Sequence, residues 1–168
     1  MGLINNQVYL ENNHKLWKTM FSDEKEKLIK IFDKDSFEIE HVGSTAIDKL
    51  SAKPIVDIAI GIPSFDIFQK YLNELSKIYL VKENYDKDEI LLVKEKGNKT
   101  LFLIHVIQVN SNRYKNMITF RDILKSNPDI LKKYELLKID LANKYSNDRE
   151  MYTKSKNDFI NEVLKNTN

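Results

Sequence analysis

Apolar positions recur along the chain with two periods, and together they predict a mixture of helices and strands. Spacings of three and four residues predict a helix over residues 14–32 and another over 64–77. Residues 43–53 should form a turn and a short helix. Runs rich in β-branched and aromatic residues predict strands at residues 37–42, 54–60, 79–83, 89–95 and 100–108. This order of elements predicts an α+β fold with a small sheet.

The pattern becomes wholly helical after residue 113. Asn127 is a candidate N-cap, since Pro128 follows it at a position where a missing N–H costs nothing. Asp148 is a candidate N-cap for the last helix. The periodicity predicts helices at residues 114–126, 130–145 and 148–165. We therefore expect one domain over residues 1–168, with a sheet-containing core at about 8–112 and a helical part at about 113–165.

Composition narrows the class of protein. The chain has 27 Lys and Arg against 25 Asp and Glu, so its net charge of +2 gives no argument for a nucleic acid or an anionic membrane as partner. It has no cysteine, which excludes disulfides and thiolate zinc sites. We see no signal peptide and no apolar run near the roughly 20 residues of a membrane span. We expect a cytoplasmic protein.

The chemically informative stretch is IEHVGSTAIDKLSAKPIVDIAIGI, residues 39–62. Gly43 lies between a strand and a short helix, where backbone N–H groups can bind a phosphate. Ser44 adds a hydroxyl donor, and Thr45 can cap the start of the helix. Lys53 either directs its charge to the same anion or is solvated. These four residues are the candidates for a phosphate-binding turn.

Asp57 lies within an apolar run of Ile, Val and Ala, where a carboxylate is unexpected. A buried carboxylate is costly unless it is paired or bound to a metal ion, so Asp57 is either functional or an acceptor for backbone N–H groups. His105 lies in a comparable apolar strand and is either a metal ligand or a structural residue. His41 shares a strand face with Ile39 and Phe37, and is either a core histidine or a cleft residue.

Further candidates lie on the predicted helices. Arg121 could clamp a phosphate with its forked donors, or form a salt bridge with Asp122. Tyr152 and Lys156 lie one helical turn apart and either face the cleft or serve ordinary packing and solvation. Tyr114 is a core residue or a platform for a base.

The segments IEHVGSTAI and AKPIVDI resemble the GrpB family, a branch of the nucleotidyltransferase fold of the DNA polymerase beta superfamily. The resemblance continues in LIHVIQ, FRDILKSNPDILKKYELLK and YTKSKNDFI, from about Val8 to Leu164. It implies a small mixed sheet flanked by helices, with a helical C-terminal part. It also implies that the glycine-serine turn holds nucleotide phosphates while strand carboxylates hold Mg²⁺.

The chain departs from the superfamily pattern in its acids. The superfamily usually carries Asp-hydrophobic-Asp on this strand, whereas here Asp57 is followed two positions later by Ala59. A third acid is expected from a neighbouring strand, which offers His105 instead. The family often has a second histidine at the position of Leu103. Asp57 and His105 could still hold one Mg²⁺ or Mn²⁺ with phosphates as co-ligands.

We therefore expect a protein that binds a nucleotide or another phosphate-containing small molecule, with weak or no catalysis. The alternative is an active metal-dependent nucleotidyltransferase that moves a nucleotidyl group from an NTP to a small acceptor, with Asp57 as the catalytic residue. Family relatives occur fused to dephospho-coenzyme A kinase, so the resemblance also implies a protein partner in coenzyme A metabolism.

Overall fold

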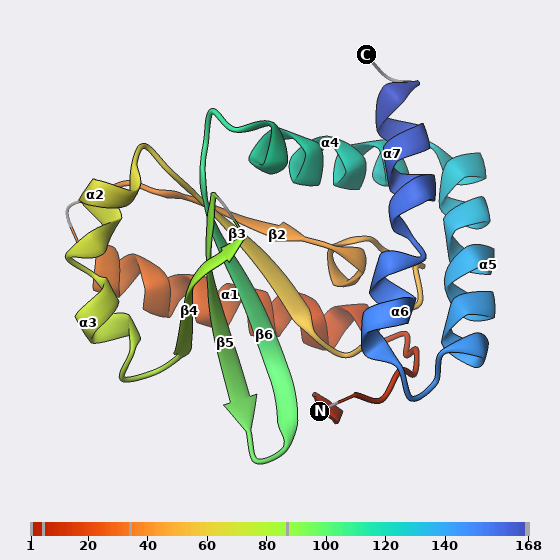
Figure 1. The fold of residues 1–168 in the computed structure, drawn as a ribbon, viewed down its shortest axis with the longest axis horizontal. Coiled ribbons are helices and arrows are strands. Elements are labelled where there is room, and N and C mark those ends of the chain that lie inside the picture. The colour runs from red at the N-terminus through yellow and green to blue at the C-terminus, as the bar shows by residue number, and fades with distance from the viewer. Residues whose placement is uncertain (1, 5, 34, 87, 167–168) are drawn as a thin grey trace.

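The computed structural model describes residues 2–4, 6–33, 35–86 and 88–166 (Figure 1). Its helices are α1 (His14–Phe32), the 3-10 turn η1 (Ser44–Ala46), α2 (Phe65–Gln69), α3 (Leu72–Leu75), α4 (Asn112–Ser126), α5 (Pro128–Lys144), α6 (Arg149–Lys154) and α7 (Asn157–Lys165). Its strands are β1 (Leu3–Ile4), β2 (Glu38–Val42), β3 (Val56–Ile62), β4 (Leu80–Asp86), β5 (Glu89–Lys96) and β6 (Lys99–Gln108).

Within the described residues, six strands form one mixed sheet in the order β2-β3-β6-β5-β4, and β1 pairs with β6. Strands β3 and β6 run parallel, whereas the other pairs are antiparallel. The register places Asp57 beside Leu103 and Ala59 beside His105. Because side chains of paired residues point to the same face of a sheet, Asp57 and His105 share one face.

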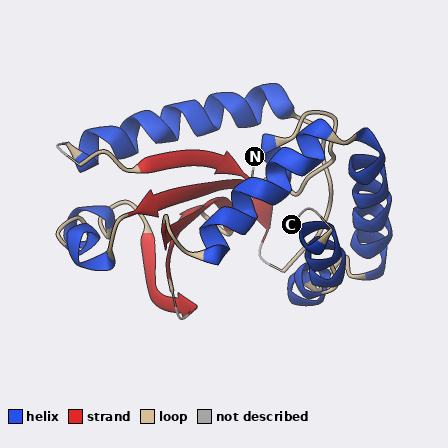
Figure 2. Cartoon of the chain, turned by 90° about the horizontal axis from the view of Figure 1, so that it is seen from above, coloured by secondary structure: helices blue, strands red, loops and turns tan. Residues whose placement is uncertain are grey.

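The two faces of the sheet have different coverings. One face carries the main apolar core, in which Ile58, Ile60 and Ile104 are fully buried against residues of α1, α2 and α3. The other face, which carries Asp57, is partly covered by α4 and meets α5–α7 at one end. Figure 2 shows α1 along one side of the sheet and the C-terminal helices gathered at the end of the molecule. None of the described helices is both long and apolar enough to cross a membrane.

The predicted caps Asn127 and Asp148 are confirmed, whereas Thr45 was wrongly predicted as a cap, because Gly43 is the N-cap of η1 and no side chain of the described residues caps it. Asn127 Oδ1 accepts a hydrogen bond from the Ile130 amide at 3.2 Å, and Pro128 occupies the first turn of α5. Asp148 Oδ1 accepts from the Met151 amide at 3.0 Å and starts α6. Both side chains satisfy a donor that the first turn of a helix leaves without an intrahelical partner.

Several predicted boundaries were wrong. The helix predicted at 64–77 consists of α2 and α3, and the Tyr71 hydroxyl between them donates to the Phe32 carbonyl at 2.8 Å. The helix predicted at 148–165 divides at residues 155–156 into α6 and α7. Strand β3 continues through Gly61, whose bare Cα lets the Tyr114 ring pack closely against it. Strand β1 was not predicted, since two residues show no alternation.

The N-terminal segment connects the sheet to the C-terminal helices. Strand β1 pairs with the start of β6. Asn6 Nδ2 then donates to the Asn147 carbonyl at 2.8 Å, and the Val8 amide donates to the Ser146 carbonyl at 2.7 Å. The first residues of the chain therefore hold the loop between α5 and α6 against the sheet.

Candidate functional site

A cavity with a volume of about 1310 Å³ opens above the sheet face that carries Asp57. Its walls come from η1, β3, β5, β6 and helices α4–α7, so it lies where the sheet meets the C-terminal helices. The basic side chains of its lining are Lys53, Lys82, Arg113, Arg121, Lys138, Arg149, Lys154 and Lys156. The acidic ones are Asp57, Glu95 and Glu150. This excess of positive charge suits an anionic molecule.

Gly43 and Asp57 are in close contact at the cavity. Gly43 has φ +67° and ψ −171°, a conformation that other residues rarely adopt. A Cβ atom at this position would lie 2.5 Å from Asp57 Oδ2 and 3.0 Å from Asp57 Cβ. Glycine is therefore required both for the turn and for the approach of the carboxylate. Ser44, which follows it in η1, also lines the cavity.

Asp57 is the first member of a chain of charges that crosses the sheet. Its Oδ1 lies 3.8 Å from Nε2 of His105 on β6. The other ring nitrogen, His105 Nδ1, contacts Glu89 Oε1 on β5, and Glu89 Oε2 pairs with Arg113 Nη2 on α4. Burial opposes ionisation of Asp57, but the interactions with His105 and the charge of Lys53 hold its pKa below the ordinary value.

His105 carries a proton in this arrangement. Burial would lower the pKa of His105, but its interactions with Asp57 and Glu89 raise the pKa to about 9. At neutral pH both ring nitrogens are then donors that face carboxylates. An imidazole binds a metal ion through a nitrogen lone pair, so a metal ion at His105 would have to displace one of these protons.

The donors around Asp57 do not fit the Mg²⁺ or Mn²⁺ site that the resemblance implied. Ala59, at the position of the second acid, is fully buried and packs with Val42, Ile107 and Tyr114. In the described part of the chain, no group of three or more acidic or histidine side chains is arranged to hold a metal ion. Mg²⁺ in proteins is usually held by one or two carboxylates together with water and phosphates, and among the described residues this wall of the cavity offers the carboxylate of Asp57 without a second one beside it.

Three lysines from different parts of the chain converge on the cavity. Burial lowers the pKa of Lys53 to about 7, and the charges of Lys156 and Arg149 add to this effect. Burial and the charge of Lys156 lower the pKa of Lys138 to about 7. Burial lowers the pKa of Lys156 to about 8, against the opposing attraction of Asp57. An anion among these ammonium groups would relieve their mutual repulsion.

Two tyrosines lie beneath these charges. Lys53 Nζ is 5.0 Å and Lys156 Nζ is 4.6 Å from the centre of the Tyr152 ring, within the range of cation–π contacts. Tyr152 is fully buried, and its hydroxyl has no hydrogen-bond partner among the described residues. Lys138 Nζ lies 5.6 Å from the centre of the Tyr134 ring. The Tyr152 and Tyr134 rings thus pack against the three lysines on one wall of the cavity.

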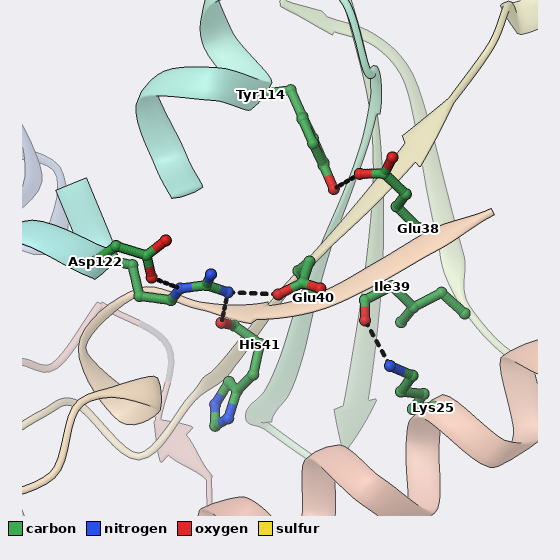
Figure 3. Close-up of polar contacts among 8 residues, drawn as sticks. Lys25, Glu38, Ile39, Glu40, His41, Tyr114 and Asp122 are labelled. Atoms are coloured by element: carbon green, nitrogen blue, oxygen red, sulfur yellow. Dashed lines mark hydrogen bonds and ion pairs between the residues drawn. The ribbon is translucent and has the colours of Figure 1, made fainter. Parts of the chain in front are cut away.

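Arg121 lines the cavity, but its guanidinium is already engaged. Its Nη1 donates to Glu40 Oε2 at 2.6 Å and to the His41 carbonyl at 3.1 Å, while its Nε donates to Asp122 Oδ1 at 2.8 Å. Figure 3 shows these contacts between α4 and β2. Arg121 thus forms the salt bridge that the sequence left open, and it joins the C-terminal helices to the sheet.

His41 lies on the opposite face of the sheet from Asp57. Its ring stacks on Phe21 of α1 with centroids 4.7 Å apart, and its Nε2 is 3.0 Å from Thr45 Oγ1. Burial lowers the pKa of His41 to about 4, so it is neutral. Thr45 lines the cavity, although its hydroxyl is paired with His41.

The described lining of the cavity does not include Tyr114, whose hydroxyl donates to Glu38 at 2.8 Å (Figure 3).

Sequence reasoning missed part of the site, chiefly Glu89, Arg113, Tyr134, Lys138 and Arg149. Lys138 had a usable signal, because it occupies the buried helical face of Tyr134 and Leu141, where a lysine is unusual. Glu89 had none, since its contact with His105 depends on the register between β5 and β6.

Comparisons with known proteins agree with this architecture. The model of the GrpB protein family matches residues 7–166. The chain belongs to the GrpB family. It is 35% identical over 171 residues to the glutamate-rich protein GrpB of Alkalihalophilus pseudofirmus, and the match covers 98% of each chain. It is 28% identical to the UPF0157 protein YqkA of Bacillus subtilis, over 89% of this chain and 44% of that relative.

Solved structures confirm the fold of this GrpB-family chain. The crystal structure of the conserved protein GrpB from Enterococcus faecalis matches with a TM-score of 0.82 and 25% identity over 95% of both chains. The MgGTP-bound Cid1 poly(U) polymerase matches with a TM-score of 0.53 and 14% identity, over 80% of this chain and 43% of the polymerase. The predicted fold, a nucleotidyltransferase-like mixed sheet with helices and a helical C-terminal part, is therefore confirmed.

Proposed function

We propose that this GrpB-family protein binds a nucleotide or another phosphate-containing small molecule in the cavity above Asp57, with weak or no catalysis. The observation that carries the proposal is the convergence of Lys53, Lys138 and Lys156 on one cavity beside the Gly43-Ser44 turn. Clustered ammonium groups with lowered pKa values are unfavourable in an empty site, and an anionic ligand compensates for this.

The size and lining of the cavity favour a ligand larger than a single phosphate ion. Besides the lysines, apolar side chains of the sheet line the cavity, among them Leu91, Val93 and Leu103. The cavity volume of about 1310 Å³ exceeds that of most small-ligand pockets. A nucleotide or coenzyme has both parts that such a site accommodates, namely a polyanionic chain and a flat, less polar group.

A second candidate function is nucleotidyl transfer with Asp57 as the catalytic residue. The nucleotidyltransferase-like fold and the ionised state of Asp57 favour it. The apolar packing of Ala59 opposes it, because a second carboxylate is missing from the position where that chemistry needs one. The test is NTP-dependent product formation across several acceptors, which Asp57→Ala must abolish if the chain transfers nucleotidyl groups.

The experiment that tests binding is thermal stabilisation by ATP, GTP, dephospho-coenzyme A, coenzyme A and inorganic phosphate, in buffer that contains Mg²⁺. A ligand at 100 times its Kd should stabilise the protein by about 2.7 kcal/mol. We expect at least one organic phosphate to stabilise the wild type and to do so less in Lys156→Gln. Lys133→Gln, an exposed lysine on α5, is the matched control. If none of these ligands shifts the wild type, the proposal is wrong.

The same screen separates the coenzyme A branch of the proposal from the nucleotide branch. Stabilisation by dephospho-coenzyme A and not by ATP or GTP would favour a role beside an enzyme of coenzyme A metabolism. Co-purification of the full chain with dephospho-coenzyme A kinase would then test the protein partner directly.

A further inference from the structure

We infer that the lysines of the cavity, rather than a divalent metal ion, balance the charge of the bound phosphate groups. This inference rests on the proposed function and makes it more specific, because it assigns the site to a metal-free polyphosphate. The inference follows from the residues that contact Asp57 and from the lysines on the opposite wall of the cavity.

The first step is that Asp57 has its partners within the protein. One carboxylate oxygen, Oδ1, faces His105 at 3.8 Å, and the other, Oδ2, lies against the backbone of Gly43. His105 is fixed in turn by Glu89, which is almost fully buried and is itself paired with Arg113. Asp57 thus faces an imidazole of the chain itself, and not a further carboxylate.

The second step is that the position of a further carboxylate is filled with apolar atoms. Ala59 has no exposed surface and packs with Val42, Ile107 and Tyr114. An ion bound at Asp57 alone would draw nearly all its other ligands from water and phosphate. The protein itself would then contribute one carboxylate to the ion, the low end of what Mg²⁺ sites in proteins provide.

The third step is the supply of donors from the opposite wall. Lys53 and Lys156 both place their ammonium groups over the Tyr152 ring, and Lys138 reaches the cavity from α5. Lys53 and Lys156 can bind the oxygens of a di- or triphosphate chain by charge-assisted hydrogen bonds, which are the strong ones. Lys138, whose Nζ donates to the Ser51 carbonyl, adds its charge to the same wall.

The test is isothermal titration of the full chain with ATP and with inorganic tripolyphosphate, in EDTA, in Mg²⁺ and in Mn²⁺. We expect binding in EDTA that is at least as tight as in Mg²⁺, since the metal neutralises part of the charge that the lysines recognise. Binding that needs Mg²⁺ or Mn²⁺ and is lost in EDTA would overturn the inference while leaving the proposed function intact. An absence of binding by both probes under all three conditions would overturn the inference, and the proposed function would fall with it only if dephospho-coenzyme A and coenzyme A also leave the wild type unshifted in the thermal screen.

A variant that removes the charge of Asp57 distinguishes the two arrangements, because they predict opposite changes in affinity for ATP. Asp57→Asn keeps the shape of the side chain and removes a negative charge near the lysines. The lysine arrangement predicts that this variant binds ATP in EDTA as tightly as the wild type or up to tenfold more tightly. A metal site predicts loss of binding instead. The Tm without ligand shows whether the variant is folded, and Lys156→Gln, for which we expect about tenfold weaker binding in EDTA, supplies the complementary result.

Discussion

The Cα of Gly43 approaches the carboxylate of Asp57 so closely that a methyl group between them would lie 2.5 Å from Oδ2. This contact fixes the position of the turn relative to β3. It also explains why glycine and aspartate occur together in this sequence, since neither the backbone conformation at Gly43 nor the space beside Asp57 tolerates a side chain.

Gly43→Ala should therefore destabilise the protein. We expect a loss of about 1–3 kcal/mol from the unfavourable backbone conformation alone, and more from the contact with Asp57. Gly97→Ala is the matched control, because Gly97 also has a positive φ but would place its Cβ in open space. Urea denaturation of both variants tests this, and equal losses would show that the approach to Asp57 has no energetic role.

The lysine cluster should lower the stability of the ligand-free protein in a pH-dependent way. The pKa of Lys156 is about 8 in the folded protein and about 10.5 in the unfolded chain, so the unfolded chain binds more protons between these values. The burial of charged Lys156 therefore lowers the free energy of unfolding by its full amount below pH 8, and this loss fades as the pH rises to about 10.5. Lys156→Gln should thus be more stable than the wild type at pH 6.5, with a smaller difference at pH 10.

Unfolding free energies at these two pH values, with Lys133→Gln as control, provide the measurement for Lys156. A variant that is less stable than the wild type by the same amount at both values would contradict the prediction. The opposite effects of Lys156→Gln on ligand-free stability and on ATP affinity are the signature of a residue kept for binding.

Glu89→Gln should lower the pKa of His105, because it removes one of the two carboxylates that hold the proton. A raised histidine pKa contributes stability that is fully present below about pH 6.5 and is lost as the pH rises through about 9. The stability advantage of the wild type over the variant should therefore shrink across this range. NMR titration of the imidazole measures the pKa directly, and Glu95→Gln on the same strand is the control. An unchanged His105 titration would refute the assignment.

Arg121→Gln should reduce stability more than it reduces ligand binding. The side chain of Arg121 is only 12% exposed and bonds to Glu40, to Asp122 and to the backbone of β2. Loss of these charge-assisted bonds should cost about 1–3 kcal/mol of unfolding free energy. Lys115→Gln, exposed on α4, is the control. An ATP affinity reduced as much as in Lys156→Gln would instead show that Arg121 is a phosphate ligand.

Local signals predicted much of the fold and several residues of the cavity. The caps Asn127 and Asp148 act within one helical turn of themselves, so their sequence context is sufficient to find them. Gly43 directly follows β2 and Asp57 lies on β3, the strand that pairs with β2, so the turn and the carboxylate are neighbours in the sequence pattern as well as in the sheet. The two caps could be predicted because every relevant distance along the chain is short.

The missed features depend on contacts that no local pattern encodes. Glu89 meets His105 only through the pairing of β5 with β6, and Arg113 reaches Glu89 only because α4 crosses the sheet. The alternation of β2 put His41 on the face of Ile39, but the packing of Phe21 of α1 against its ring could not be read from β2. Strand β1 is too short to have a period, and its place is set by β6.

The bond between Asn6 and Asn147 spans 141 residues, and it has a consequence for how the protein is made. During synthesis the first residues leave the ribosome long before the loop that they hold against the sheet. Contacts at such separations form late, because the intervening chain must first be ordered. The cavity wall formed by α5 and α6 can therefore close only after translation of most of the chain, and until then the apolar side chains of β5 and β6 that line the cavity, Leu91, Val93 and Leu103, are open to chaperones and to aggregation.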